Sequence, residues 1–390
     1  MKQTKKIFYS VAFLCLFKPM MFNYWEILDL LVNILSGLLF LFLALQLLKK
    51  WRYKTIHSVT YLILLLHFIV FISTFFHHGN LRLFYVGMIS SGSLAMFLEI
   101  YCEDMQKIIK TWFPLVELFL CINIVSIFLG GKGSEDWLVD YFLGSKNTFQ
   151  VVFASYFVIA YLYGFYFPNR KIHVKLCYVL MLAAVITTKS LTMLIELFIF
   201  IILLIYRKIN LFRKFLEYRY LLIVFLCVFS LLIVLVVNTN VDGILSVFEG
   251  TEKGSGTLNE RIKIWGVGIN LIIENPIIGV GKLTPEGWES NIGIIDFKTQ
   301  LHNQIIEYFA TGGIILLSVL LSIYFLTAKR IHDFNRFTIA QVLSLVCFSL
   351  NITNLTEAYY NGLFYFPFII SSYLSCILCD NKVLNKNCKL

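Results

Sequence analysis

Arg261 and His302 are the side chains best suited to chemistry in the long polar segment from 238 to 303. Arginine is a permanent cation whose planar fork binds phosphate through paired hydrogen bonds. Histidine is the side chain most easily used for proton transfer near neutral pH. The segment contains five Lys or Arg and eight Asp or Glu, a net charge of −3. Arg261 is therefore not one member of a general basic surface.

A simpler interpretation stays open for each residue. The position of Arg261 also suits an ion pair with a neighbour on the helix surface or a contact with a lipid head group. Exposed ion pairs of this kind contribute little to stability. His302 has the placement of a histidine that only forms hydrogen bonds at the membrane interface. Phosphate binding by Arg261 and proton transfer by His302 are therefore hypotheses, and they depend on the elements that position the two residues.

The residues around Arg261 predict an amphipathic helix from about 258 to 274, lying on the membrane or on a helical bundle. Thr257 and Glu260 have the spacing of a capping box, and Pro276 ends the helix. Apolar residues follow at helical intervals, namely Ile262, Trp265, Ile269, Ile272 and Ile273. Arg261 then falls in the first turn, where free backbone amides favour a phosphate.

Two glycines follow the predicted helix. The sequence Asn275-Pro276-Ile277-Ile278-Gly279-Val280-Gly281 reads as a turn in which another group approaches the backbone closely. It lacks the strand, the third glycine and the helix of a nucleotide-binding fingerprint. The turn is therefore a structural feature and not a nucleotide site.

The whole chain has the composition of a membrane protein. Of its 390 residues, 59% are hydrophobic and 14% charged, more apolar than a soluble domain. The apolar runs are long and do not alternate, so they predict helices of about 20 residues and not barrel strands. The net charge of +10 fits basic cytoplasmic loops better than nucleic-acid binding. We therefore expect an all-α polytopic membrane protein with no nucleic-acid partner.

Hydropathy predicts about 12 transmembrane helices. They cover 7–22, 27–48, 57–77, 82–101, 112–130, 147–167, 173–187, 190–206, 220–237, 304–326, 338–356 and 360–379. The chain then divides into a bundle of about nine spans (1–237), a large loop (238–303), and about three further spans with a tail (304–390). If successive connections lie on alternating sides of the membrane, 23 of the 33 Lys and Arg are on the same side. This excess predicts cytoplasmic termini and an extracytoplasmic loop.

Two of the acidic residues inside predicted spans are singled out, since a charge there is costly and marks a functional candidate. They are Glu196 and Glu307, and Glu307 lies about one turn beyond His302-Asn303. The alternative is that either one only pairs with Lys189 or with the polar groups gathered toward the end of the span 338–356. Both interpretations stay open at the level of sequence.

The order of these residues resembles the O-antigen ligase/polymerase family, which includes Wzy-type capsule and O-antigen polymerases. The residues that carry the resemblance are Arg261 with Trp265, Asn275-Pro276 with Gly279 and Gly281, and His302-Asn303 followed by Gly312-Gly313. It is clearest over about 185 to 320. It implies a glycosyltransferase of GT-C-like architecture in the bacterial cytoplasmic membrane, acting on undecaprenyl-pyrophosphate-linked oligosaccharides at the outer face.

The resemblance also implies roles for individual residues. Arg261 would bind the donor pyrophosphate, and His302 would activate or orient the acceptor hydroxyl. Lys189 holds the place of a family arginine that opens an earlier span, and it keeps the charge without the fork. Lys146 would add a second cation, while Asn303, Glu307 and Glu196 are supporting candidates.

Charge stabilisation by Lys and Arg is the simpler hypothesis for this reaction than a metal ion. Breaking a bond between a sugar and pyrophosphate develops negative charge on the leaving phosphate, which fixed cations stabilise. The outer segments contain no Asp-x-Asp of the kind that holds a metal in many sugar-nucleotide enzymes. The sequence therefore predicts metal-independent catalysis without a cofactor.

Three functions compete. The leading hypothesis is a polymerase that joins lipid-linked repeat units, with membrane lipids, a flippase and a chain-length regulator of the same pathway as partners. A ligase that passes finished polymer to an acceptor differs from it little in sequence. A transporter or flippase of lipid-linked sugars would concentrate charges in the spans with repeat symmetry, and this chain concentrates them in one loop.

Overall fold

The computed structural model describes most of the chain as helices. The described residues are 2–52, 56–132, 139–145, 148–188, 190–209, 214–238, 255–284, 286–287, 301–355, 357–359 and 361–380. Within them the only β-type pairing consists of two isolated bridges, from Lys132 to Asp140 and from Asp140 to Ser145. The expected all-α class is confirmed.

Helices occupy the positions of the predicted spans. In chain order they are α1 Lys2–Leu16, α2 Glu26–Trp51, α3 Ser58–Phe76, α4 Leu81–Gly87, α5 Ser93–Tyr101, α6 Met105–Phe128, α7 Phe149–Tyr166, α8 Lys171–Thr187, α9 Leu191–Tyr206, α11 Tyr218–Asn238, α13 Ser255–Glu274, α15 Gln304–Asp333, α16 Thr338–Thr353, α17 Gly362–Ser372 and α18 Leu374–Asp380. A π-helical turn, Met88–Gly92, joins α4 to α5.

Five helical segments in the described part of the chain are long and apolar enough to cross a membrane. They are Glu26–Trp51, Ser58–Phe76, Phe84–Phe128, Phe149–Tyr166 and Gln304–Asp333. Shorter apolar helices accompany them, including Tyr218–Val234 and Thr338–Thr353. This pattern is that of a polytopic membrane protein, and the figure of 12 spans stays a prediction.

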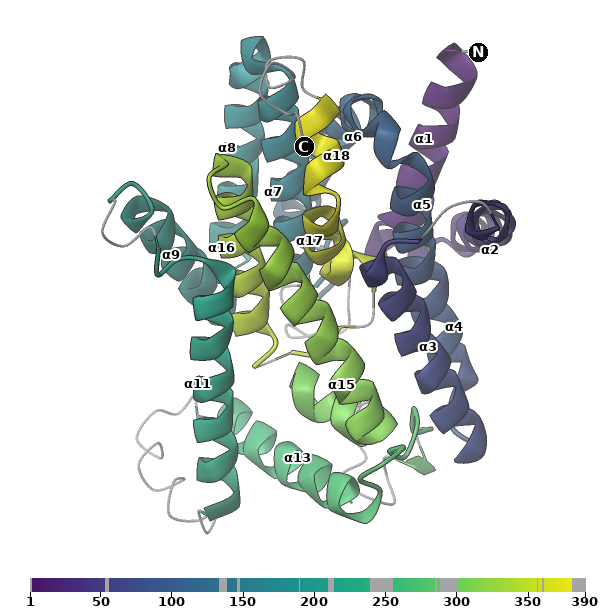
Figure 1. Cartoon of the computed structure of the whole chain (residues 1–390), viewed down its shortest axis with the longest axis vertical. Coiled ribbons are helices and arrows are strands. Elements are labelled where there is room, and N and C mark those ends of the chain that lie inside the picture. The colour runs from purple at the N-terminus through teal and green to yellow at the C-terminus, as the bar shows by residue number, and fades with distance from the viewer. Residues whose placement is uncertain are drawn as a thin grey trace.

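The bundle has a crosswise helix at one end. Figure 1 shows α13 lying across that end, beside the lower parts of α11 and α15, while the N-terminus of α1 lies at the opposite end. On the flank, α2 exposes apolar side chains such as Ile27, Leu38 and Leu45, as expected of a helix that faces lipid. The crosswise helix carries Arg261, so this end of the bundle is where the candidate site lies.

Helix α15 is broken near its start. Gly312 and Gly313 have non-helical backbone angles, with φ of −134° and +63°. A break inside an apolar bundle leaves backbone amides and carbonyls without helical partners, and burying them unpaired is costly. Another part of the chain must therefore supply their hydrogen bonds.

The turn after α13 supplies them. Three backbone hydrogen bonds join it to the break: the amide of Ile314 donates to the carbonyl of Pro276 (2.9 Å), that of Val280 to Ala310 (2.8 Å) and that of Gly281 to Thr311 (2.9 Å). The close backbone approach expected at Gly279 and Gly281 is therefore present, and the group that approaches is the broken helix. The turn fixes the end of α13 against the start of α15.

Gly313→Ala is expected to destabilise the protein by about 3 kcal/mol or more, through strain and overpacking. A Cβ at this position would lie 2.0 Å from the carbonyl oxygen of Ile277, and φ is +63°. The measurement is the thermal unfolding midpoint of the purified protein in detergent. Gly37→Ala is the matched control because a Cβ there meets nothing within 4 Å. Equal midpoints for the two variants would contradict the role of the break.

Candidate active site

A carboxylate connects the two residues singled out by the sequence. Glu357 Oε1 accepts a hydrogen bond from Arg261 Nη2 at 2.8 Å, and Glu357 Oε2 lies 3.1 Å from His302 Nδ1. The Glu357 side chain is 7% exposed, whereas those of Arg261 and His302 are 20% and 22% exposed. The acid is thus buried behind a cation and an imidazole that both reach solvent.

Three different elements bring these residues together. Arg261 projects from α13, His302 directly precedes the N-cap of α15, and Glu357 lies between α16 and α17. The apolar face of α13 packs against the start of α15 in a small cluster of Ile262, Ile264, Trp265, Leu271, Val280, Leu301, Ile306 and Ala310. The predicted amphipathic helix therefore lies on the bundle.

The start of that helix differs from the prediction. Helix α13 begins at Ser255, so Arg261 is beyond the first turn and the free amides at the helix start are not next to it. The capping-box spacing misplaced the boundary because the chain is already helical before Thr257. The Ile273 side chain is 70% exposed, so it lies outside the face of α13 that packs on the bundle.

His302 has a backbone conformation that is rare for a side-chain-bearing residue. Its φ is +50°, in the left-handed region where histidine is enriched but still uncommon. A carboxylate only accepts hydrogen bonds, so Nδ1 of a neutral imidazole beside Glu357 carries the hydrogen and Nε2 carries the lone pair. The geometry thus suits His302 to accept a proton at Nε2.

Asn303 has a structural position next to His302. Its side-chain oxygen caps α15 by accepting from the amides of Ile305 and Ile306, each at 3.1 Å. Its side-chain amide donates to the carbonyl of Leu355 at 3.2 Å. The neighbouring Gln304 side chain donates to the carbonyl of Tyr359 at 2.8 Å. These contacts hold the segment that carries Glu357 against the start of α15.

Glu307 and Glu196, the two acids singled out in the predicted spans, have different partners. Glu307 pairs with Lys282, with 2.8 Å between Oε1 and Nζ, and both side chains are buried. Burial lowers the pKa of Lys282 from its ordinary value, and the adjacent carboxylate opposes that shift. Glu196 accepts a hydrogen bond at 2.6 Å from the Ser349 hydroxyl of α16. Both acids thus have a pairing partner, as in the alternative interpretation of the sequence. The partner of Glu307 is Lys282, which the sequence did not suggest.

The remaining predicted cations lie outside the described residues. Lys146 and Lys189 belong to the parts of the chain that the structure does not describe. Their roles therefore stay as the resemblance implies them.

Sequence reasoning missed the contacts of Glu357 and Lys282. Glu357 was visible as an acid at the end of a predicted span, which is a signal of function by itself. Nothing in its spacing indicated contact with Arg261 or His302, because the contact depends on how α15 and α16 pack. Lys282 is one of several Lys and Arg in a loop that is acidic overall, and its sequence position did not distinguish it from the others.

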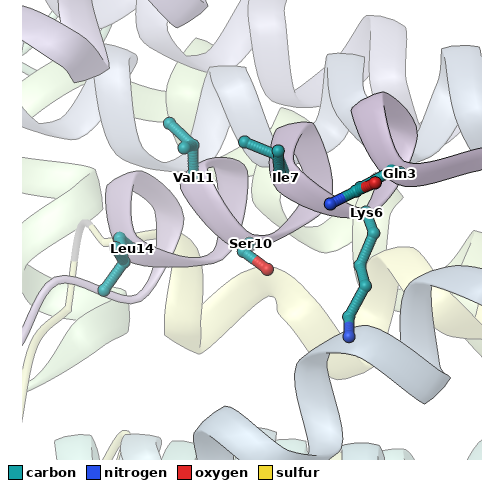
Figure 2. Close-up of a pocket in the computed structure, with 6 residues that line it drawn as sticks. All are labelled: Gln3, Lys6, Ile7, Ser10, Val11 and Leu14. Atoms are coloured by element: carbon teal, nitrogen blue, oxygen red, sulfur yellow. The ribbon is translucent and has the colours of Figure 1, made fainter. Parts of the chain in front are cut away.

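A hollow on α1 lies elsewhere. Figure 2 shows it lined by residues of that helix alone: Gln3, Lys6, Ile7, Ser10, Val11 and Leu14. Helix α1 begins at the end of the bundle opposite α13 (Figure 1). The hollow is thus separate from the Arg261 site.

A comparison with protein families supports the resemblance. No curated protein matches the sequence. A family model does match residues 176–321, somewhat more than a third of the chain. The matched region includes Arg261, Lys282, His302 and Glu307, while Glu357 lies beyond it. The chain therefore carries a segment that matches the O-antigen ligase family.

Proposed function

We propose that the protein is a polymerase that joins undecaprenyl-pyrophosphate-linked oligosaccharide repeat units into a surface polysaccharide. The observation that carries the proposal is the Glu357 bridge between Arg261 and His302, beside a segment that matches the O-antigen ligase family. A cation for the leaving pyrophosphate and a base for the attacking hydroxyl are the two groups that this transfer needs.

Arg261 acts on the donor. When the bond between the sugar C1 and the phosphate oxygen breaks, its electron pair stays on the phosphate, and the guanidinium stabilises the developing charge. The 2.8 Å bond to Glu357 fixes the plane of the guanidinium, so its donors are oriented before substrate arrives. Lys146 and Lys189 are further cations for the same pyrophosphate. Charge stabilisation by these side chains is metal-independent.

His302 acts on the acceptor. Its Nε2 takes the proton of the incoming hydroxyl while that oxygen forms the new glycosidic bond at C1. The resulting imidazolium is stabilised by Glu357, whose Oε2 lies 3.1 Å from Nδ1. The proton then passes to solvent, and undecaprenyl pyrophosphate leaves. The imidazole is 22% exposed, which is compatible with access by an acceptor.

The orientation in the membrane is part of the proposal. We place the Arg261 end at the extracytoplasmic face of a bacterial cytoplasmic membrane and both termini in the cytoplasm. Support comes from the basic residues expected on one side and from the N-terminus of α1, which lies at the end of the bundle opposite α13 (Figure 1). A flippase and a chain-length regulator are the expected partners.

A ligase is the second candidate, and the description of the matching family favours it. Polymerase and ligase break the same donor bond and differ in the acceptor. In a polymerase the acceptor hydroxyl belongs to another lipid-linked repeat unit. In a ligase it belongs to a different molecule that receives the finished polymer.

Reconstitution with a defined lipid-linked repeat unit tests the proposal. The purified protein in proteoliposomes is expected to convert the single unit into a ladder of lipid-linked products, separated by size on a gel. A ladder absent with this substrate alone, together with transfer to an added acceptor, would favour the ligase. Movement of the lipid-linked unit across the bilayer without any new glycosidic bond would favour a transporter.

A further inference from the structure

Lys282 and Glu307 form a buried ion pair beside the candidate site. The distance between Lys282 Nζ and Glu307 Oε1 is 2.8 Å, and the two side chains are 8% and 2% exposed. Desolvation makes such a pair weak evidence for stability, because apolar residues of similar volume often do as well. A pair at this position therefore calls for a reason other than stability.

The second oxygen of Glu307 supplies a reason. It accepts a hydrogen bond from the backbone amide of Leu301 at 2.7 Å. Leu301 directly precedes His302, whose φ is +50°. A non-glycine residue keeps such a conformation only when its surroundings hold it there. Glu307 fixes the chain before His302, and the Asn303 cap fixes it after.

Lys282 reaches Glu307 from a firmly held backbone. Its amide donates to Thr74 Oγ1 at 3.0 Å, and its carbonyl accepts from the amide of Asn80 at 2.7 Å. Both partners belong to α3 and the turn that follows it. The backbone from which the Lys282 side chain extends is therefore fixed. The charge of its ammonium holds the Glu307 carboxylate in the orientation that reaches the Leu301 amide.

We propose that Lys282 and Glu307 are positioning residues that hold His302 at the distance from Glu357 at which it can act as a base. The inference rests on the proposed function and adds two residues to its machinery. Neither side chain needs to touch the substrate. The pair acts through the Leu301 amide, so the quantity it controls is the turnover number and not the binding of the lipid-linked donor.

Two double variants separate positioning from folding. Lys282→Met with Glu307→Gln removes both charges but keeps an oxygen that accepts from Leu301. Lys282→Met with Glu307→Met removes the charges and that acceptor. Neither leaves a lone buried charge, which is the usual reason for loss of fold. Should the second variant not be recovered, Glu307→Asn with Lys282→Met replaces it, since the shorter amide does not reach Leu301.

The readouts are kcat and KM for the lipid-linked repeat unit in the reconstituted system. The Gln variant is expected to lose no more than about tenfold in kcat, because the Lys282 charge that orients the side chain is gone but a neutral acceptor for the Leu301 amide remains. The Met variant is expected to lose about a hundredfold in kcat, as a misplacement of about 1 Å does, with KM within about twofold. Lys329→Met, at an exposed position of α15, is the control.

Equal kcat values in the two double variants would overturn the inference, whether both are high or both are low. Equal high values would mean that the Leu301 contact does not matter to turnover. Equal low values would mean that a charge of the pair acts directly. Failure of the wild-type protein to form any glycosidic bond would overturn the proposed function as well, and is seen before any variant is made.

Discussion

Arg261→Ala protein is expected to form no product longer than the single repeat unit, with a loss of at least about 100-fold in turnover. The guanidinium pairs with Glu357, the carboxylate that also contacts His302. Its removal leaves the charge on the leaving pyrophosphate without this stabilisation, and it also leaves the buried Glu357 carboxylate without one partner. Product ladders from the reconstituted protein measure the effect.

Arg261→Lys distinguishes charge from geometry. Lysine keeps the positive charge but replaces the planar fork with a single ammonium, so we expect a turnover between those of the wild-type and alanine proteins. Arg330→Ala, at an exposed position toward the other end of α15, should polymerise normally. Wild-type product lengths from the Arg261→Ala protein would remove Arg261 from the mechanism.

Glu357→Gln is expected to lower turnover about 100-fold. This loss lies at the lower end of the range expected for His302→Ala, about 100-fold to 10,000-fold. A glutamine amide at position 357 can donate to Nδ1, which favours the tautomer with the hydrogen on Nε2. That tautomer has no lone pair facing the acceptor, so the base is lost although the side-chain shape is kept. Glu357→Asp, which keeps the carboxylate, is expected to retain partial activity.

The two changes should not add. If Glu357 acts through His302, the double variant His302→Ala with Glu357→Gln is no slower than His302→Ala alone. Single-turnover rates with a lipid-linked donor measure this directly. Multiplicative losses in the double variant would mean that Glu357 acts mainly through Arg261, its other partner at 2.8 Å.

The sequence predicted the helices well because their signal is local. A run of apolar residues long enough to cross a bilayer is readable without knowing its neighbours, and α3 and α7 begin and end within two residues of the predicted spans. The boundary of α13 was less accurate because its start depends on a polar segment where propensity is weak. Helix type was predictable and helix ends were less so.

The candidate site was predictable only in part. Arg261 and His302 stand out by residue type, but the residue that joins them is set by packing. Glu357 meets them because the Asn303 and Gln304 side chains bond to Leu355 and Tyr359, on either side of it, and hold them against the start of α15. No periodicity encodes that contact. The same is true of Lys282, whose partner depends on the turn that fills the break in α15.

The break at Gly312 and Gly313 divides α15 into a short piece and a long piece. The short piece carries Glu307 and begins at Gln304, directly after its N-cap Asn303, and it is tied through the Pro276 to Lys282 turn to α3. The long piece, 314–333, crosses the bundle. A break in a helix is where bending ordinarily occurs, but here the same turn bonds to Ala310 and Thr311 on the short piece and to Ile314 on the long one. The angle between the two pieces is therefore set by main-chain hydrogen bonds, so a change in the tilt of the long piece in the bilayer would be carried to the His302 end of the helix.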